Sequence, residues 1–354
     1  MILVDLTYVD RGDMTTGIAV VAYNLLHEWQ NTTRQNFVIL VRPSTISTIR
    51  KEFPKYQTFV CNSLYFINPA FHRLVKSADV LFYPCINAHS LIAPGIKRVG
   101  ILHDIQKFKL LKKASLKGLA YSHWMKWMLR RYDTIITISE AVSNEIRKLD
   151  KHVANKKIVV VPNSIIKYAP VPIEGFDRTD YILNVNTLYP YKNIETLIKA
   201  FNEIKNAIPH SLVIKARPTE YWYDTVYPLI VKYGITDRVV LIDKRLTFGQ
   251  MAHLYSNASL FVSPSTMEGF GLTPVEAAIY NVPVITSSLD VFKETTLGLV
   301  NYYKETYNHN ELAQKMLEVL YNANSSKCEA IARKLETKYS VTAQAGKILK
   351  LLMP

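Results

Sequence analysis

Short, mostly apolar runs recur along the chain, and stretches with helical periodicity separate many of them. The runs lie at Ile2–Tyr8, Phe37–Val41, Val80–Tyr83, Arg98–His103, Thr134–Ser139, Ile158–Val161, Tyr181–Val185, Leu212–Ala216, Val239–Ile242, Leu260–Val262 and Val284–Thr286. Strands that are apolar on both faces are typical of parallel sheets covered by helices on either side. Their alternation with helices therefore predicts an α/β fold with doubly wound, Rossmann-like sheets.

The length of the chain and one irregular stretch predict two domains. A chain of 354 residues exceeds the usual size of a single domain. Residues 165–180 combine prolines and a glycine with little periodicity, which is typical of a linker. We expect an N-terminal domain (1–167), a C-terminal domain (168–339) and a last helix (340–354) that packs back on the first domain. Because open parallel sheets bind ligands beyond the carboxyl ends of their strands, two such domains facing a central cleft would hold a ligand there.

The charge balance favours an acidic partner. Lysine and arginine number 43 against 29 acidic residues, which gives a net charge of +14 and a pI near 9.4. Nucleic acid, a phosphorylated substrate and an anionic membrane surface are the three classes of partner that such a charge suits.

Three scattered cysteines, Cys61, Cys85 and Cys328, have neither metal nor redox spacing and predict reduced thiols in a cytoplasmic protein. The chain opens on a strand-like run, and none of its apolar runs approaches the roughly 20 residues that span a membrane. We therefore expect no signal peptide and no membrane span.

The most informative segment is "SPSTMEGFGLTPVEAAIYNVPVITSS", residues 263–288. A strand-like run ends, Glu268-Gly269-Phe270-Gly271 follows, and a helical pattern then carries Glu276. Thr273 and Glu276 have the types and spacing of a capping box, with Thr273 as N-cap. A cap needs neither Glu268 nor the glycines, whereas glycines let the backbone approach a ligand and a helix N-terminus binds anions. The segment therefore indicates an anion site as well as a helix start.

Two other turns join a strand to a helix. Lys192 follows Tyr181–Val185 and precedes a stretch with an apolar stripe at helical spacing. A cation at a helix N-terminus costs about 0.3–1 kcal/mol, so a solvated lysine and a ligand for a diphosphate are equally good interpretations. Gly17 follows a polar loop, and a lone glycine there favours an ordinary turn.

His103 and Asp104 stand at the end of another strand-like run. A hydrogen-bonded histidine at a strand end and a histidine that contacts substrate are equally good interpretations. Asp104 would orient the imidazole or bind a substrate hydroxyl.

A basic segment lies between Ile105 and Tyr132. It has no acidic residue and eight basic ones, with aromatic residues among them: Lys107, Lys109, Lys112, Lys113, Lys117, Lys126, Arg130 and Arg131, with Phe108, Tyr121, Trp124 and Trp127. Leu116, Ala120, Trp124, Trp127 and Met128 could share one helix face. A packed helix with a basic solvent face and a patch on anionic lipid are equally good interpretations. Nucleic acid is a weaker one, because no nucleic-acid-binding motif accompanies the segment.

The segment "LYSNASLFVSPSTMEGFGLTPVEAAIYNVPVITSS" resembles the donor-binding segment of retaining GT4-type glycosyltransferases of the GT-B fold, whose signature is two glutamates separated by seven residues. "YILNVNTLYPYKNIETLIKAF" resembles the segment that supplies that family's phosphate-binding lysine. "VVVPNSI" resembles the end of its N-terminal domain, and "ILHDI" and "TISEAV" resemble landmarks of its acceptor domain. The resemblance covers most of residues 98–288 and is loose over the first ninety.

The resemblance implies a role for each matching residue. Glu276 would bind the ribose hydroxyls of a nucleotide-sugar, and Glu268 would contact the donor sugar. Lys192 would neutralise the diphosphate and Gly17 would let the first loop approach it, while His103 would sit at the reacting sugar. The remaining donor contacts would be Gly269, Phe270, Gly271, Leu272 and Thr273.

One position departs from the family. A glycine and an arginine often stand in the turn before the lysine, where this chain has Asn186 and Thr187. Arg217 and Arg245, which follow other strand-like runs, could replace that arginine as contacts for the phosphate or the base.

The resemblance implies a retaining transfer of a hexose such as mannose or glucose from a nucleotide-diphosphate sugar to a glycan acceptor, with no metal and no other cofactor. The acceptor hydroxyl would attack on the face that the diphosphate leaves, and domain closure would exclude water. We expect a lipid-linked acceptor for a surface polysaccharide and a cytoplasmic enzyme that is peripheral on the inner membrane face. The membrane or acceptor patch would comprise Lys112, Lys113, Lys117, Trp124, Trp127, Arg130 and Arg131. Alternatives are a soluble acceptor and a non-catalytic nucleotide-sugar-binding protein.

Overall fold

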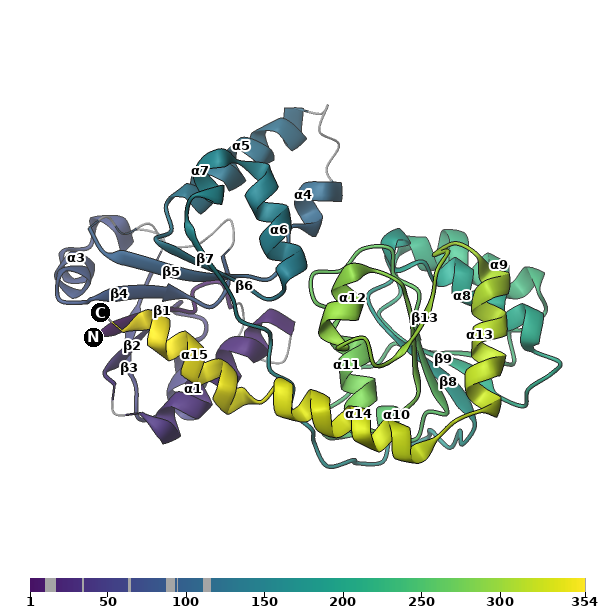
Figure 1. The fold of residues 1–354 in the computed structure, drawn as a ribbon. Helices are drawn as coiled ribbons and strands as arrows, with labels where there is room; N and C mark the ends of the chain where they lie inside the picture. The colour runs from purple at the N-terminus through teal and green to yellow at the C-terminus, as the bar shows by residue number, and fades with distance from the viewer. Residues whose placement is uncertain are drawn as a thin grey trace. The chain divides into compact units, whose positions relative to one another are not determined.

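The computed structural model describes residues 1–9, 17–33, 35–62, 65–86, 93, 95–110 and 116–353. The chain divides into two compact units (Figure 1). Unit 1 comprises Met1–Ser164 and Tyr339–Pro354, and unit 2 comprises Ile165–Lys338. The chain therefore passes from one unit to the other twice.

Unit 1 is built on a seven-stranded sheet in the order β3-β2-β1-β4-β5-β6-β7, and its paired strands run parallel. The strands are β1 (Ile2–Asp5), β2 (Phe37–Val41), β3 (Gln57–Val60), β4 (Val80–Tyr83), β5 (Lys97–Leu102), β6 (Thr134–Thr137) and β7 (Lys157–Val160). The helices are α1 (Gly17–Thr32), α2 (Ile46–Glu52), η1 (Tyr65–Ile67), α3 (Pro69–Lys76), α4 (Gln106–Leu110), α5 (Leu116–Arg130), α6 (Glu140–Leu149), α7 (Lys151–Ala154) and α15 (Val341–Leu352).

Unit 2 is built on a six-stranded parallel sheet in the order β10-β9-β8-β11-β12-β13. The strands are β8 (Tyr181–Val185), β9 (Ser211–Lys215), β10 (Val239–Ile242), β11 (Leu260–Ser263), β12 (Val284–Ser287) and β13 (Asn301–Tyr303). The helices are η2 (Pro190–Lys192), α8 (Ile194–Ile204), η3 (Trp222–Val226), α9 (Tyr227–Lys232), α10 (Phe248–Ser256), α11 (Leu272–Ile279), α12 (Asp290–Thr295), α13 (His309–Tyr321) and α14 (Ser325–Lys338).

The doubly wound α/β class predicted from the apolar runs is confirmed, since every predicted run overlaps a strand. Two strands were not predicted, β3 and β13. Each stands at the edge of its sheet, and β3 is exposed or half-buried at all four positions. The strand β3 is not buried on both faces and β13 has only three residues, so neither has the continuous apolar run on which the prediction relied.

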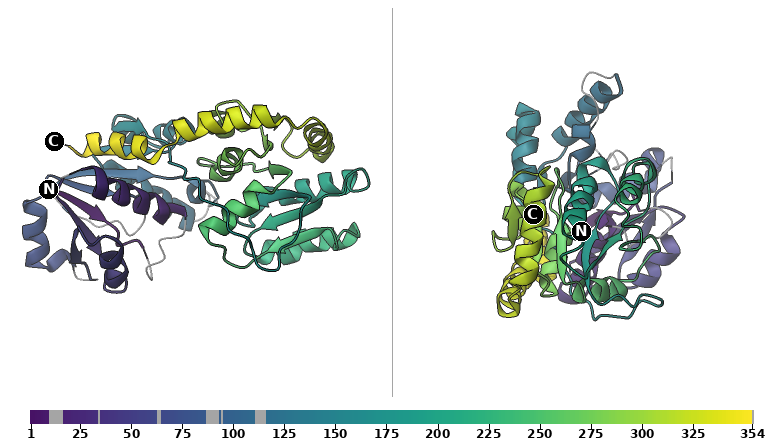
Figure 2. Two further views of the ribbon diagram at one scale, coloured as in Figure 1. Left: turned by 90° about the horizontal axis from the view of Figure 1, so that it is seen from below. Right: turned by 90° about the vertical axis from the view of Figure 1, so that its right-hand side faces the viewer.

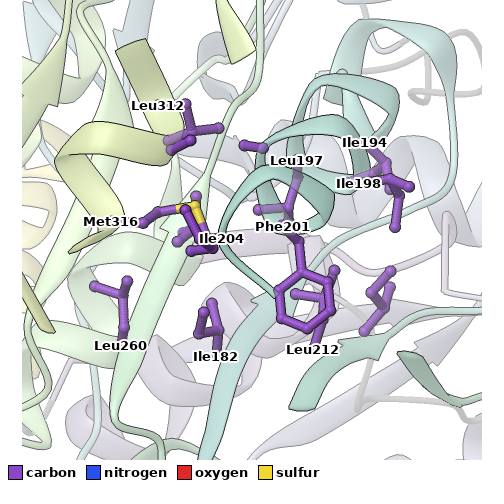
Figure 3. Packing of buried hydrophobic residues seen from close by; sticks show 14 of the residues in the cluster. Ile182, Ile194, Leu197, Ile198, Phe201, Ile204, Leu212, Leu260, Leu312 and Met316 are labelled. Carbon is purple, nitrogen blue, oxygen red and sulfur yellow. The ribbon is translucent and has the colours of Figure 1, made fainter. Parts of the chain in front are cut away.

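The core of unit 2 fixes the turn that carries Lys192. Buried side chains of α8, among them Leu197 and Phe201, pack between the sheet and α13 (Figure 3). Full burial of a side chain such as Phe201 contributes about 1.5–3 kcal/mol. The helix ends at Ile204, and Ile208, which lies beyond the helix, is also buried in this core.

The C-terminal helix α15 belongs to unit 1 and packs along α1, as two views show (Figures 1 and 2). The indole Nε1 of the buried Trp29 donates a hydrogen bond of 3.1 Å to the carbonyl oxygen of Ala345. Among the described helices, none is both long and apolar enough to cross a membrane. Cys61, Cys85 and Cys328 all lie in the described ranges and form no disulfide.

Candidate functional site

Two residues that the sequence singled out separately form an ion pair in unit 2. β8 and β11 are parallel neighbours, so the loops that follow them leave the same edge of the sheet. Lys192, in the loop after β8, donates from Nζ to Glu268 Oε1, in the loop after β11, at 2.7 Å. The two side chains are only 13% and 11% exposed. Each residue had a role in the sequence-based prediction, but their contact was not predicted.

Backbone contacts hold the same two loops together. Thr266 donates to the carbonyl oxygen of Tyr191 from both its backbone nitrogen, at 2.8 Å, and its hydroxyl, at 3.1 Å. Tyr191 directly precedes Lys192 on one loop, and Thr266 lies two residues before Glu268 on the other. Hydrogen bonds between the two loops therefore hold the backbone next to both members of the ion pair.

Asn193 joins the loops from inside the protein. Its backbone lies in the left-handed region with φ 55°, and its side chain is 3% exposed. The amide nitrogen Nδ2 donates to the carbonyl oxygens of Pro264, at 3.1 Å, and Thr306, at 2.8 Å. Sequence reasoning missed this residue. Its signal was an asparagine directly before a helix, because asparagine adopts the left-handed conformation more readily than most residues.

The glycine turn starts α11 earlier than the capping-box prediction placed it. The N-cap is Gly271, with φ 74°, and no side chain caps the helix. Thr273 is the second residue of the helix, so the prediction that it forms a capping box with Glu276 is wrong. A Cβ on Gly271 would lie 2.4 Å from Cε1 of the buried Phe292. Glycine thus replaces the side-chain cap and leaves the first amides of α11, including those of Leu272 and Thr273, without intrahelical acceptors.

Glu276 lies in the middle of α11 and is half-buried. Its Oε2 accepts a hydrogen bond of 2.7 Å from the hydroxyl of Tyr255 on α10. Burial raises the pKa of Glu276, and the Tyr255 hydroxyl acts in the opposite direction. The other carboxylate oxygen has no hydrogen-bond partner in the described part of the chain. One oxygen is thus fixed and the other can accept from a ligand hydroxyl.

The remaining candidates of unit 2 lie near the same edge of the sheet. Gly269 and Phe270 are buried between Glu268 and Gly271. Arg217 follows β9 by two residues, Arg245 follows β10 by three, and both are exposed. Across the described ranges, no group of three histidine, cysteine, aspartate or glutamate side chains could hold a metal ion.

In unit 1, His103 follows β5 directly and is 8% exposed. Its Nε2 lies 2.8 Å from the carbonyl oxygen of Pro84. A carbonyl only accepts, so Nε2 carries the proton and Nδ1 is left as an acceptor. Burial lowers the pKa of His103, which favours the neutral imidazole. The contact that orients the ring comes from Pro84, and Asp104 instead accepts from the backbone nitrogen of Gln106 at 3.1 Å.

Four further candidates of unit 1 lie close to or outside the limits of the residues that the structure describes. Gly17 is the first residue of α1, and the polar loop before it, residues 10–16, lies outside the described residues. Lys112 and Lys113 also lie outside the described residues, and Lys117 is in the first turn of α5.

Of the residues that could share one face of this helix, Met128 is buried and Ala120, Trp124 and Trp127 are partly or well exposed. Met125, Met128 and Leu129 form the buried side of α5, whereas Trp124 is half-buried and Trp127 is 46% exposed. Residues two apart on a helix point to nearly opposite sides, so burial of Leu129 places Trp127 outward.

The arginines that follow on this helix differ in their contacts. Arg130 pairs with Asp150, and that hydrogen bond, together with backbone amides, lowers the pKa of the aspartate to about 2. The guanidinium of Arg131 lies 4.7 Å from the ring centre of Trp127. Arg130 therefore has a structural partner, while the half-buried Arg131 lies against the exposed Trp127.

Two family models match the chain. Residues 172–336 match the model described as "Glycosyl transferases group 1", and residues 15–166 match the one described as "Glycosyltransferase Family 4". The two matches divide the chain near the boundary between the units.

The curated relatives are mannosyltransferases in several cases. The chain is 30% identical over 233 residues to the O-antigen chain mannosyltransferase RfbU of Salmonella typhimurium, which covers 66% of this chain and 64% of that relative. It is 27% identical over 171 residues to the MMP alpha-(1->4)-mannosyltransferase of Mycolicibacterium hassiacum, with 48% and 40% covered. The chain thus matches less than two thirds of the length of either relative.

Solved structures share the fold. Sucrose-phosphate synthase from Thermosynechococcus elongatus has a TM-score of 0.71 at 17% identity, with 99% of this chain and 97% of that chain covered. Anabaena HepE in complex with UDP-glucose has a TM-score of 0.72 at 15% identity, with 99% and 98% covered. Both halves of the sequence and the fold agree with the resemblance, and the chain belongs to the GT4-type glycosyltransferases of the GT-B fold.

Proposed function

We propose that the protein transfers a hexosyl group, mannosyl in first place, from a nucleoside-diphosphate sugar to a hydroxyl of a glycan acceptor, with retention of the anomeric configuration. The observation that carries the proposal is the Lys192–Glu268 pair at the edge of the sheet that also presents the start of α11. In a family of glycosyltransferases, this combination suits a ligand with an anionic and a hydroxyl-rich part.

Each part of the site suits one part of such a donor. Lys192 and the first amides of α11 supply positive charge for a diphosphate. The free oxygen of Glu276 suits a ribose hydroxyl, and Glu268 suits a hydroxyl of the sugar. Because Lys192 and Glu268 are in contact, they would bind the diphosphate and the sugar side by side. The bond between the sugar and the diphosphate, which breaks in the reaction, would then lie next to this ion pair.

The chemistry needs charge stabilisation at the leaving group. The acceptor oxygen bonds to the anomeric carbon on the face from which the diphosphate departs, and the bond between that carbon and the phosphate oxygen breaks. The acceptor proton passes to the departing phosphate oxygen, so the products are a glycoside and a nucleoside diphosphate. Lys192 and the helix amides stabilise the developing negative charge, a role that requires no metal ion. His103 in unit 1, whose pKa burial lowers and whose Nδ1 is available as an acceptor, has the chemistry to bind a sugar hydroxyl.

The names of the relatives support the donor and the acceptor. RfbU of Salmonella typhimurium is named as an O-antigen chain mannosyltransferase, and WbdA of Escherichia coli, 26% identical over 179 residues, as a serotype-specific mannosyltransferase. A mannosyl donor and a growing surface polysaccharide are accordingly the first choices.

A donor panel tests the function. GDP-mannose, UDP-glucose, ADP-glucose and dTDP-glucose are each added to the protein and the melting temperature is measured. At about 100 times its Kd, the cognate donor stabilises the folded state by about 2.7 kcal/mol, and we expect one nucleotide to dominate. That donor should yield an α-linked product with a lipid-linked glycan acceptor, as anomeric proton NMR would show. A panel without any shift contradicts donor binding, and an inverted product contradicts retention.

We also propose that the outward side of α5 contacts an anionic membrane surface that presents the acceptor. Trp127 and Leu119 are 46% and 47% exposed, and Arg131 covers the Trp127 ring. A tryptophan beside basic residues is typical of the interface between lipid and water.

Vesicle binding tests this contact. The protein should co-sediment with vesicles that contain phosphatidylglycerol, and about 0.5 M salt should release it because salt screens surface charge. Replacing Trp127 and Arg131 together by Ala and Gln should weaken binding about fivefold or more, given about 1 kcal/mol for each basic residue at the surface. Tyr321→Ala, at a residue of unit 2 that is 69% exposed, is the matched control. Equal binding to neutral vesicles would contradict the proposal.

A further inference from the structure

Lys215 occupies a place at the candidate site that no sequence argument assigned. It is the last residue of β9 and pairs in register with Val185 at the end of β8 and with Ile242 at the end of β10. Its carbonyl oxygen accepts a 3.2 Å hydrogen bond from the backbone nitrogen of Asn186. Lys215 therefore adjoins Thr187, where an arginine is expected from the family resemblance.

The alternation of the strand shows which face of the sheet Lys215 lies on. Leu212 and Ile214 belong to the core cluster packed against α8, so Lys215 lies on the other face. On β8, Tyr181 and Val185 lie on that same other face. The Tyr181 hydroxyl donates a hydrogen bond of 2.7 Å to the carbonyl oxygen of Leu254 in α10. The helices α10 and α11 cover this side of the sheet, opposite α8 (Figure 1). Glu276 and the N-terminus of α11 lie on the same side as Lys215.

The ammonium group of Lys215 has no partner in the described part of the chain. Its side chain is half-buried, and no hydrogen bond or ion pair of Nζ occurs there. Burial lowers the pKa of Lys215, while the neighbouring Asp243 raises it and Arg217 lowers it. A half-buried cation without a hydrogen-bond or ion-pair partner costs free energy that an anionic ligand would offset.

The loop after Lys215 is braced against the loop after β8. The Thr219 hydroxyl donates a 2.6 Å hydrogen bond to the carbonyl oxygen of Leu188. This contact brings the β9 loop against the turn of Asn186 and Thr187 and so fixes the direction in which the end of β9 leaves the sheet.

We propose that Lys215 binds a phosphate oxygen of the nucleoside-diphosphate donor and takes the place of the arginine missing at Thr187. The inference rests on the proposed function, because it needs a diphosphate at this edge. Lys215 would then approach the diphosphate from the end of β9, Lys192 from the loop after the neighbouring strand β8, and the amides of α11 from a third direction.

The test compares ligands that differ only in their phosphates. Isothermal titration is carried out on the full chain with UDP, GDP and ADP and with uridine, guanosine and adenosine. A charged hydrogen bond contributes enough that Lys215→Met should weaken binding of the cognate nucleoside diphosphate about tenfold to hundredfold. The affinity for the corresponding nucleoside should stay unchanged, and Lys215→Arg should restore most of the loss.

Controls separate a ligand contact from a structural role. Lys232→Met removes an exposed lysine of α9 and should change no affinity. The Lys215→Met protein without ligand should melt at or above the wild-type temperature, because an unpaired, half-buried charge has been removed. A lower melting temperature with unchanged phosphate preference would overturn the inference, as would equal losses for nucleoside and diphosphate. If the wild-type protein binds none of the three diphosphates, the proposed function fails first, and the inference falls with it.

Discussion

Glu268→Gln should reduce glycosyl transfer at least about 10²–10³-fold while the fold and nucleotide binding persist. The substitution keeps the size of the side chain and an oxygen that can accept from Lys192, but it removes the negative charge of the pair. Glu268 is the carboxylate expected at the sugar, so the loss should appear in kcat. Lys192→Met should instead weaken nucleoside-diphosphate binding, because the ammonium is the part expected at the phosphates.

Transfer kinetics and titration with the cognate nucleoside diphosphate distinguish these outcomes. The matched control is Glu336→Gln, which breaks an exposed ion pair of the same unit, between Lys167 and Glu336 at 2.8 Å. Exposed pairs contribute about 0–1 kcal/mol, so this variant should transfer sugar at the wild-type rate. Undiminished transfer by Glu268→Gln would remove Glu268 from the reaction.

Gly271→Ala should lower the free energy of unfolding of unit 2 by about 2–5 kcal/mol. The left-handed backbone at φ 74° costs alanine about 1–2 kcal/mol. The new methyl group would also lie 2.4 Å from Cε1 of Phe292, a fully buried ring that cannot move freely, and overpacking of this kind costs about 1–3 kcal/mol. Because Gly271 is the N-cap of α11, the same change should shift the amides proposed for the diphosphate and weaken nucleotide binding.

Urea denaturation and nucleotide titration measure the two effects. Gly298→Ala is the matched control, since Gly298 has a similar φ of 67° and a methyl group there would meet no described atom within 4 Å. It should show the backbone cost alone. Adding Phe292→Leu to Gly271→Ala should recover part of the difference, and equal losses at the two glycines would contradict the proposed clash.

The fold followed from the apolar runs because strands buried on both faces leave an unmistakable composition. What failed were features set by neighbours distant in sequence. The exposed edge strand β3 needs only half of its residues apolar, and the side of α5 that is buried depends on the elements that pack against it. The composition of a segment indicates a strand that is buried on both faces, but it does not indicate which distant residues pack against the segment.

The candidate site was predictable residue by residue but not as an arrangement. Lys192, Glu268 and Glu276 carried signals in their local sequence, but their partners did not. The contact between Lys192 and Glu268 spans 76 positions, and the Tyr255 hydroxyl reaches Glu276 from another helix. The capping-box prediction failed because Gly271, and not Thr273, is the N-cap of α11. Only glycine fits at position 271, because a Cβ there would clash with the ring of Phe292. Asn193 was missed because the carbonyl oxygens that its side chain binds, those of Pro264 and Thr306, are distant in the sequence and come near only in the folded chain.

The position of α15 bears on the order in which the protein is made. A ribosome synthesises all of unit 2 before it reaches α15, although Trp29 of unit 1 has its acceptor at Ala345. Unit 1 therefore lacks its last helix during this time, and the part of α1 that α15 contacts is uncovered, while unit 2 is a continuous stretch that is already complete. During synthesis an N-terminal domain usually finishes folding before a C-terminal one. Here the order is the opposite, because unit 2 is translated in full before the last helix of unit 1.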